Sequence, residues 1–283
     1  MTTPTSSSLV WFITGTSQGF GNELVRAALR RGDSVVATSR QPEKVAASFN
    51  GDSGRLLAIP LDLRSEALVS AGVDAAIKRF GRIDVLVNNA GHGLLGAVEE
   101  ATDAEVAGVF ETNVFGLLRV TRAVLPYMRK QRSGHIVNLS SIGGLVGLPG
   151  WGIYNSTKFA VEGLSEALAQ ELAPLGIRVT IVEPGPFRTD FLGGSLAATK
   201  QKLADYEESA GKTRKYAIER DGAQPGDPAL AAEAIIKAVT AENPPLHLLL
   251  GAFAYERAGA KLDEMKKEFA AWRDVALSTD YKS

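Results

Sequence analysis

The stretch that decides the fold is Thr14-Gly15-Thr16-Ser17-Gln18-Gly19-Phe20-Gly21. It ends the apolar run Leu9–Thr14, which is typical of a buried strand, and it leads into a helical pattern over Gly19–Arg31. Glycines let the backbone approach phosphate oxygens, while the free amides and the dipole of a helix N-terminus attract their charge. The stretch therefore predicts a pyrophosphate site formed by Gly15, Ser17, Gly19, Phe20 and Gly21. Glycines also end turns for purely structural reasons, so both interpretations of this motif alone remain open.

Short apolar runs and longer helical patterns alternate along the rest of the chain, which is typical of repeated strand-helix-strand units and a parallel sheet. We expect strands at Leu9–Thr14, Ser34–Thr38, Leu56–Pro60, Ile83–Val87, His135–Leu139, Ile177–Val182 and Leu246–Leu250. We expect helices at Gly19–Arg31, Pro42–Phe49, Ser65–Phe80, Thr102–Arg129, Tyr154–Leu175, Pro228–Ala241 and Phe253–Leu277. The pattern predicts an α/β chain whose residues 9–283 form one doubly wound Rossmann domain, with about seven parallel strands and helices on both faces.

Composition excludes several classes of function. Of the 283 residues, 45% are hydrophobic and 22% are charged, so a disordered chain is not expected. The chain has 31 Lys and Arg and 32 Asp and Glu, and this balance of charge disfavours a nucleic-acid binder. The chain has no Cys and only three His, which excludes thiolate chemistry and disfavours a metal site. No apolar run is long enough to span a bilayer, and no signal peptide is recognisable. We expect a cytoplasmic protein whose first eight residues are a flexible terminus.

One segment, at about residues 187–227, breaks the alternation of strands and helices. It contains Gly193-Gly194 and a polar helical pattern from Ala197 to Tyr216. Long insertions in compact domains commonly form substrate lids, which is the interpretation we favour over a plain surface excursion.

The end of the second predicted strand selects the form of the dinucleotide. An acidic residue there would bind the ribose hydroxyls of NAD, but this chain has Ser39 and Arg40, and an arginine can hold a 2′-phosphate with two hydrogen bonds. NADP is therefore predicted in preference to NAD, unless Arg40 is a solvated loop residue. After the third strand, Asp62 and Leu63 are candidates for the adenine, although Asp62 suits a turn or a helix N-terminus equally well.

Several motifs together carry a resemblance to a known family. In order and interval the chain resembles the short-chain dehydrogenase/reductase family over about residues 9–190, through Thr14–Gly21, Asn88-Asn89-Ala90-Gly91, Asn113, Ser141, Tyr154-x-x-x-Lys158 and Pro184-Gly185. Phe12, Arg40 and the segment Glu183–Thr189 are similar to the branch that contains retinol and hydroxysteroid dehydrogenases. The resemblance implies reversible hydride transfer between a nicotinamide cofactor and a carbonyl or alcohol carbon.

The spacing of Tyr154 and Lys158 has a direct physical meaning. Residues four apart share one helix face, so the ammonium lies within reach of the phenol and of a cofactor ribose. A fixed cation favours phenolate, and we expect it to lower the tyrosine pKa from its usual value of about 10 toward neutrality. The Tyr154 side chain then serves as general acid or base. A Tyr and a Lys one turn apart are also common by chance, so the pair needs the other motifs beside it.

The resemblance assigns the remaining residues. It implies that Ser141 polarises the substrate carbonyl, with the neighbouring Ser140 as the competing candidate, and that Asn113 holds a water that links Lys158 to solvent. The cofactor would be held by the turn Asn89, Ala90 and Gly91, by Tyr154 and Lys158, and by Pro184, Gly185, Phe187 and Thr189.

The sequence thus predicts an NADP(H)-dependent oxidoreductase acting on a small hydrophobic carbonyl or alcohol, without a metal. The alternatives are a lyase or epimerase of the same fold and a dinucleotide-binding regulator without turnover. Apolar residues on more than one stripe of Thr102–Arg129 and Tyr154–Leu175 favour a homodimer or homotetramer through these helices.

Overall fold

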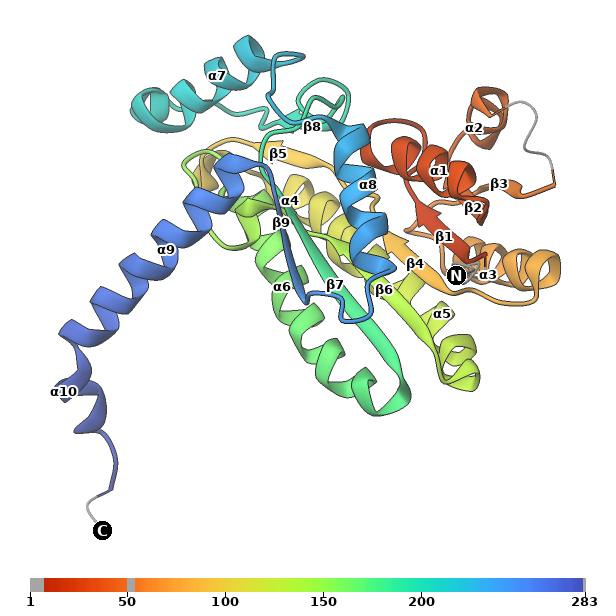
Figure 1. Cartoon of the computed structure of the whole chain (residues 1–283). Helices are drawn as coiled ribbons and strands as arrows, with labels where there is room; N and C mark the ends of the chain where they lie inside the picture. The colour runs from red at the N-terminus through yellow and green to blue at the C-terminus, as the bar shows by residue number, and fades with distance from the viewer. Residues whose placement is uncertain (1–7, 50–53, 282–283) are drawn as a thin grey trace.

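A computed structural model describes residues 8–49 and 54–281, so the first seven residues of the expected flexible terminus lie outside it. Seven strands form one parallel sheet in the order β3-β2-β1-β4-β6-β7-β9 (Figure 1). Their bounds are β1 Val10–Thr14, β2 Ser34–Ser39, β3 Leu56–Pro60, β4 Val85–Asn88, β6 Gly134–Leu139, β7 Ile177–Pro184 and β9 His247–Leu250. The predicted parallel sheet is confirmed, and each expected strand lies within two residues of its predicted bounds at either end.

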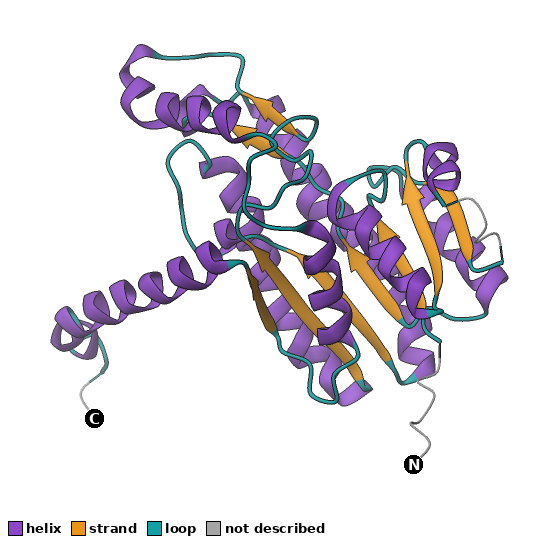
Figure 2. Cartoon of the chain, turned by 45° about the horizontal axis from the view of Figure 1, so that its top comes forward, coloured by secondary structure: helices purple, strands orange, loops and turns teal. Residues whose placement is uncertain are grey.

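Helices cover both faces of the sheet (Figure 2). Alternate residues of β1 enter different cores: Trp11 packs with residues of α1 (Gly19–Arg31) and α8 (Pro228–Val239), whereas Phe12 packs with residues of the opposite layer. That opposite layer consists of α3 (Glu66–Phe80), α5 (Leu117–Gln131) and α6 (Gly152–Leu172), and α2 (Pro42–Ser48) lies between β2 and β3. A strand buried on both faces needs apolar residues at consecutive positions, which explains the unbroken apolar runs in the sequence.

The direction in which successive strands are added to the sheet changes between β1 and β4. From β1 the sheet grows first toward β2 and β3, and then, from β4 onward, in the opposite direction. In doubly wound sheets, ligands bind at the carboxyl ends of the strands beside such a switch point. The glycine turn after β1 and the Asn88–Gly91 turn after β4 both lie there.

The helix expected over Thr102–Arg129 is interrupted, which corrects the prediction. It divides into α4 (Asp103–Phe110), a π-helical turn (Glu111–Gly116) and α5. Inserted π-helical turns are rare in proteins, but those that occur are often found at functional sites. The candidate residue Asn113 lies within this turn.

The expected lid has a different internal structure from the prediction. Its polar stretch begins as a strand, β8 (Leu196–Ala198), which pairs in parallel with β5 (Gly93–Leu95), and only then turns into short helical segments and α7 (Lys212–Arg220). The second sheet was not predicted because three-residue strands leave almost no periodicity to detect. A fully buried Glu100 accepts a hydrogen bond from Arg214 at 2.6 Å and ties α7 to the body.

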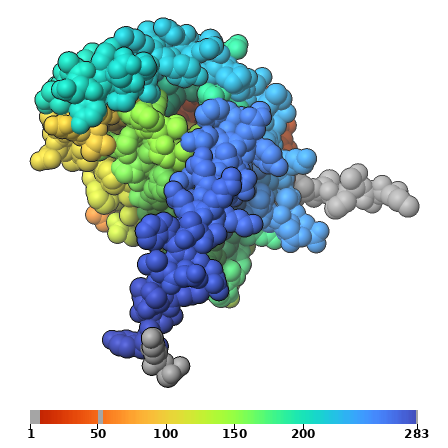
Figure 3. Space-filling view, turned by 90° about the vertical axis from the view of Figure 1, so that its left-hand side faces the viewer, coloured from red at the N-terminus to blue at the C-terminus, as the bar shows by residue number. Residues whose placement is uncertain are grey.

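The C-terminal helices leave the body of the domain. Ala254 and Ala258 at the start of α9 (Ala252–Ala271) pack on Ile142 and Val146, and the helix then projects outward toward α10 (Arg273–Leu277) (Figures 1 and 3). Within residues 8–49 and 54–281, none of the helices combines the length and apolar character needed to cross a membrane.

Candidate active site

The glycine turn after β1 has the conformation that an anion site requires. Gly15 and Gly19 have φ values of +70° and +58°, which favour glycine. The N-cap residue of α1, Gln18, makes no side-chain capping bond, and the first turn carries no acidic residue. The amides at this helix end are thus left for another acceptor, and the surrounding charge does not oppose an anion. The turn fits the pyrophosphate that the sequence predicts for it.

Gly21 is the most restrictive position of the turn. A Cβ atom there would lie 2.3 Å from the carbonyl oxygen of Gly15 and 2.5 Å from Nδ2 of Asn89. We expect Gly21→Ala to push the turn away from the Asn88–Gly91 segment and to lower the free energy of unfolding by about 1–3 kcal/mol. Thermal or urea unfolding measures this loss. Gly163→Ala on α6, where a Cβ atom has open space, serves as the control and should raise stability by up to about 1 kcal/mol, because alanine favours a helix over glycine.

The Asn88–Gly91 segment is joined to the glycine turn by hydrogen bonds. The Nδ2 atom of Asn89 donates to the carbonyl oxygens of Thr14 and Gly15, both at 2.8 Å, and Oγ1 of Thr14 accepts from the amide of Ala90 at 3.0 Å. Gly15 allows this approach, because a Cβ atom on it would lie 2.8 Å from Cα of Ala90. Asn88 points elsewhere and donates from Nδ2 to Thr121 and Asn138 within the core. The structure therefore brings these two predicted cofactor segments together.

Ser39 and Arg40 differ in their surroundings. The Oγ atom of Ser39 is buried and lies 2.6 Å from Oγ of Ser17, so it joins the end of β2 to the glycine turn. Arg40 is exposed, and its guanidinium has no hydrogen-bond or ion-pair partner in the described part of the chain. An unpaired cation beside the glycine turn is the arrangement expected of a 2′-phosphate site.

Asp62 and Leu63 have partners in the protein. Asp62 accepts from the backbone and side chain of Arg64, with the closest contact at 2.6 Å, and this pairing lowers the pKa of Asp62 to about 2. The carbonyl oxygen of Leu63 accepts from Arg119, and its side chain packs on Gly116. The turn interpretation of Asp62 is therefore realised, and its contact with adenine stays a prediction.

The segment after β7 faces the glycine turn. The Phe187 ring packs on the ring of Phe20 with centroids 5.1 Å apart, and the Phe187 carbonyl oxygen accepts from the Thr189 amide at 2.9 Å, so a backbone contact with the cofactor stays a prediction. The side chain of Thr189 lies beside Gly19, since a Cβ atom on that glycine would be 3.3 Å from Cβ of Thr189. Pro184 ends β7, and the Gly185 amide donates to the carbonyl oxygen of Leu250.

The two neighbouring serines after β6 have separate partners. Ser141 accepts from the amide of Gly143 at 3.0 Å, and its hydroxyl lies close enough to the Tyr154 phenol to lower the pKa of that group. Ser140 donates to Oε1 of Glu162 on the other side of the backbone. The geometry therefore supports Ser141, rather than Ser140, as the serine that polarises the substrate carbonyl, because Ser140 is bound to Glu162.

Tyr154 and Lys158 are buried on one face of α6, and Nζ of Lys158 lies 5.7 Å from the Tyr154 ring centre. Nζ donates to the carbonyl oxygen of Leu139 at 2.7 Å. Burial lowers the pKa of Lys158 to about 8, against the opposing effect of Glu162. Burial also raises the pKa of Tyr154, and the Ser141 hydroxyl only partly opposes this. The expected lowering of the Tyr154 pKa is therefore wrong for this arrangement, because burial disfavours the charged phenolate more than the Ser141 hydroxyl favours it.

Asn113 is held by its side chain in the π-turn. Nδ2 donates to the carbonyl oxygen of His92 at 2.9 Å and to Oγ1 of Thr157 at 3.1 Å, and Oδ1 accepts from the His92 amide. A mid-helix asparagine is explained by these bonds, which join three elements next to Lys158. His92 is thereby fixed through its backbone.

Two aromatic side chains, one at the start of α6 and one from the lid segment, surround Tyr154. Its ring centre lies 5.6 Å from that of Trp151 and 5.5 Å from that of Phe191, and Trp151 and Phe191 stack on each other. Phe191 belongs to the lid segment, and a Cβ atom on Gly93 would approach both Phe191 and Leu196. Phe191 lies within the lid segment expected from the sequence, but only tertiary contacts show that its ring reaches Tyr154.

Comparison with known proteins gives the same assignment as this geometry. Residues 9–200 match the family model described as short chain dehydrogenase. The chain is 40% identical over 240 residues to 3-ketodihydrosphingosine reductase of Bacteroides thetaiotaomicron, covering 84% of this chain and 86% of the relative. It is 36% identical over 251 residues to human retinol dehydrogenase 8, covering 83% and 78%. A crystal structure of a short-chain dehydrogenase from Streptomyces avermitilis superposes with a TM-score of 0.92 at 42% identity, covering 97% of this chain and all of that one. The chain therefore belongs to the short-chain dehydrogenase family and is an NAD(P)-dependent oxidoreductase.

Proposed function

We propose that this protein is an NADP(H)-dependent reductase of a hydrophobic ketone or aldehyde. The observation that carries the proposal is that the hydroxyls of Ser141 and Tyr154 lie near each other, with Lys158 one helical turn after Tyr154, at the same edge of the sheet as the glycine turn. Two hydroxyls at one point suit a carbonyl oxygen, because each can donate a hydrogen bond to it. When bound, the nicotinamide supplies the hydride to the carbonyl carbon.

The proton chemistry belongs to the chain's own residues. The raised pKa of Tyr154 keeps the phenol protonated, which is the state that a general acid needs before it donates to the developing alkoxide. The ammonium of Lys158 then stabilises the phenolate that remains, and Ser141 holds the oxygen in place. Since the side chain of Asn113 is engaged with His92 and Thr157, its part is to hold this region in position, and a water that returns the proton would be held by the backbone of the π-turn.

The preference for NADP rests on Arg40, an exposed cation directly after β2 that makes no hydrogen bond or ion pair within the described residues and acts on Asp62 only through its charge. Ser39 and Ser17 form the hydroxyl pair beside it. A planar guanidinium suits a phosphate better than a ribose hydroxyl. In a cell, NADPH would drive the reaction toward the alcohol.

The substrate class rests on the aromatic walls formed by Trp151 and Phe191 around Tyr154. Apolar walls with two convergent hydroxyls suit a hydrophobic carbonyl compound. The two named relatives point the same way, because one is a reductase of 3-ketodihydrosphingosine and the other a retinol dehydrogenase.

The proposed assembly is a homodimer or homotetramer that uses α5 and α6. Phe115 in the π-turn and Phe159 on α6 are both about half exposed, which suits burial against a second copy.

A panel of aliphatic and aromatic ketones and aldehydes, incubated with NADPH or NADH, tests the function through the decay of absorbance by the reduced cofactor. We expect NADPH oxidation that rises with the apolar size of the carbonyl compound. Cofactor retained through turnover without net oxidation would instead identify a lyase or epimerase. Tight binding without any turnover would identify a regulator.

A further inference from the structure

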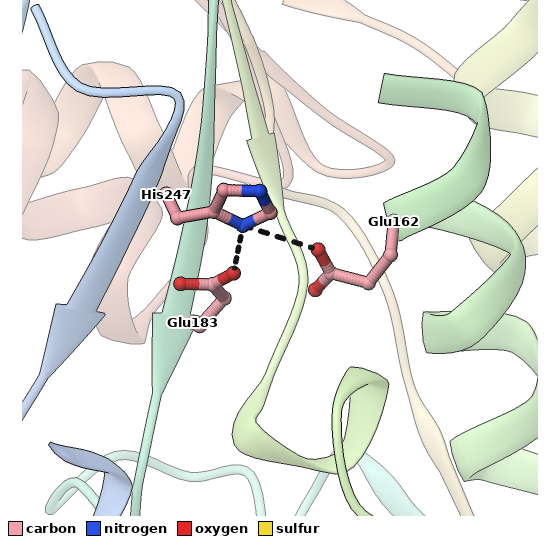
Figure 4. A group of neighbouring side chains, drawn as sticks. All are labelled: Glu162, Glu183 and His247. Atoms are coloured by element: carbon pink, nitrogen blue, oxygen red, sulfur yellow. Dashed lines mark hydrogen bonds and ion pairs between the residues drawn. The ribbon is translucent and has the colours of Figure 1, made fainter. Parts of the chain in front are cut away.

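A buried group of titratable side chains lies behind the catalytic residues, on the side away from the glycine turn. It consists of Glu162 on α6, Glu183 on β7 and His247 on β9. One side-chain nitrogen or oxygen atom from each lies within 4.8 Å of the other two (Figure 4). Nδ1 of His247 lies 2.7 Å from Oε1 of Glu183 and 3.9 Å from Oε2 of Glu162. The two carboxyl groups are buried, whereas the imidazole side chain is 43% exposed at the edge of the sheet. The proposed reduction uses none of these three residues.

Glu162 connects this group to both parts of the catalytic apparatus. It lies one helical turn after Lys158, and it is the one charged group that raises the pKa of that lysine against the effect of burial. Its Oε1 atom accepts the hydrogen bond from Ser140, the residue next to Ser141. A Cβ atom on Gly144 would lie 2.7 Å from Oε1, so the carboxyl group also packs closely on the backbone of the turn that follows Ser141.

The surroundings of Glu162 make its charge adjustable. Burial, supported by the charge of Glu183, raises the pKa of Glu162 to about 7 against the opposing effects of Ser140, His247 and Lys158. Among the described residues, these four are the polar or charged groups that act on it, and they come from α6, the turn after β6, β7 and β9. The Oε2 atom has no hydrogen-bond partner in the described residues. A buried carboxyl group without full pairing is costly, so its retention beside Lys158 calls for an explanation.

We propose that Glu162 is a positioning residue for Lys158: its carboxylate, held by Ser140, keeps the buried ammonium charged so that it can bind the cofactor ribose and support Tyr154. This inference rests on the proposed function, and it adds a residue that acts on the reaction only through Lys158. Glu183 and His247 adjust the charge of Glu162 from the surface side. The substitution Glu162→Gln would keep the shape of the side chain and an acceptor oxygen for Ser140, but it would remove the negative charge of the carboxylate.

The test is the pH dependence of NADPH affinity, measured by fluorescence titration between about pH 6 and about pH 10. In the wild type, affinity should fall as Lys158 loses its proton near pH 8. Without the carboxylate the ammonium is less favoured, so in Glu162→Gln the same fall should occur at a pH lower by about one unit. Ser140→Ala removes one bond that favours the charged carboxyl group, and it should shift the fall in the same direction by less. A parallel pH profile of ketone reduction should show the same shifts.

The matched control is Glu166→Gln, which removes an exposed carboxylate one turn further along α6. Its profile should coincide with that of the wild type. If Glu162→Gln lost NADPH affinity by the same factor at every pH, the proposal would be overturned and Glu162 would have only a packing role. A wild-type NADPH affinity that does not change near pH 8 would also overturn it. If Glu162→Gln does not fold, the shift in Ser140→Ala decides. A wild type that binds NADPH normally but reduces no carbonyl compound would refute the proposed function, whereas an unshifted profile in an active enzyme would refute only the role of Glu162.

Discussion

Tyr154→Phe should lower the rate of NADPH-dependent carbonyl reduction by about a thousandfold while the protein still binds NADPH. The substitution removes only the hydroxyl, which lies near Ser141 and, in the proposed reaction, carries the proton that the alkoxide needs. The ring that packs on Trp151 and Phe191 remains, so the fold should not change. Single-turnover absorbance at saturating NADPH and ketone measures the loss in the chemical step.

The control for this prediction is Tyr255→Phe, because Tyr255 is an exposed phenol on α9, outside the lid segment. It should reduce ketones at the wild-type rate. If Tyr154→Phe kept more than about a tenth of the wild-type rate, another group would have to donate the proton, and the assignment of the general acid would be wrong.

Arg40→Ala should weaken NADPH binding by about 30- to 100-fold and leave NADH binding nearly unchanged. The guanidinium is exposed and unpaired in the described part of the chain, so its removal should cost the fold little. What is lost is a charge-assisted bond to the 2′-phosphate, which only one of the two cofactors has. Titration of both cofactors against wild type and variant measures the ratio of their dissociation constants.

Arg64→Ala serves as the control for charge alone. Arg64 is also exposed and lies near the same strand ends, but its guanidinium is paired with Asp62 at 2.6 Å. Its loss should change the ratio of the two dissociation constants much less than the loss of Arg40. A wild type that binds NADH as tightly as NADPH would reduce Arg40 to a loop residue and remove the basis for the NADP preference.

The local motifs could be predicted because each is a short-range requirement of the backbone or of helix geometry. Consecutive apolar residues over Leu9–Thr14 are typical of a strand buried on both faces. Gly15 and Gly19 take positive φ values that favour glycine. The spacing of Tyr154 and Lys158 places both on one face of any helix. The seven strands, the glycine turn and the family resemblance could therefore be found without coordinates.

Other features depend on residues far apart in the chain. The pairing of β5 with β8 joins segments about a hundred positions apart, and Phe191 reaches Tyr154 only because that pairing positions the lid. The choice between Ser140 and Ser141 followed from which partner lies on each side of the backbone.

The sequence by itself determined the fold class and the family resemblance, because buried strands, turn glycines and the intervals between motifs are local features of the chain. The catalytic side chains are those that the resemblance implies, and their roles stay a prediction. Only the tertiary structure decided the charge states and neighbours of those side chains. Burial raises the pKa of Tyr154 and lowers that of Lys158, and Glu162 acts against the second of these effects. Desolvation depends on everything packed around a group, so no pattern within one segment of the chain can reveal it.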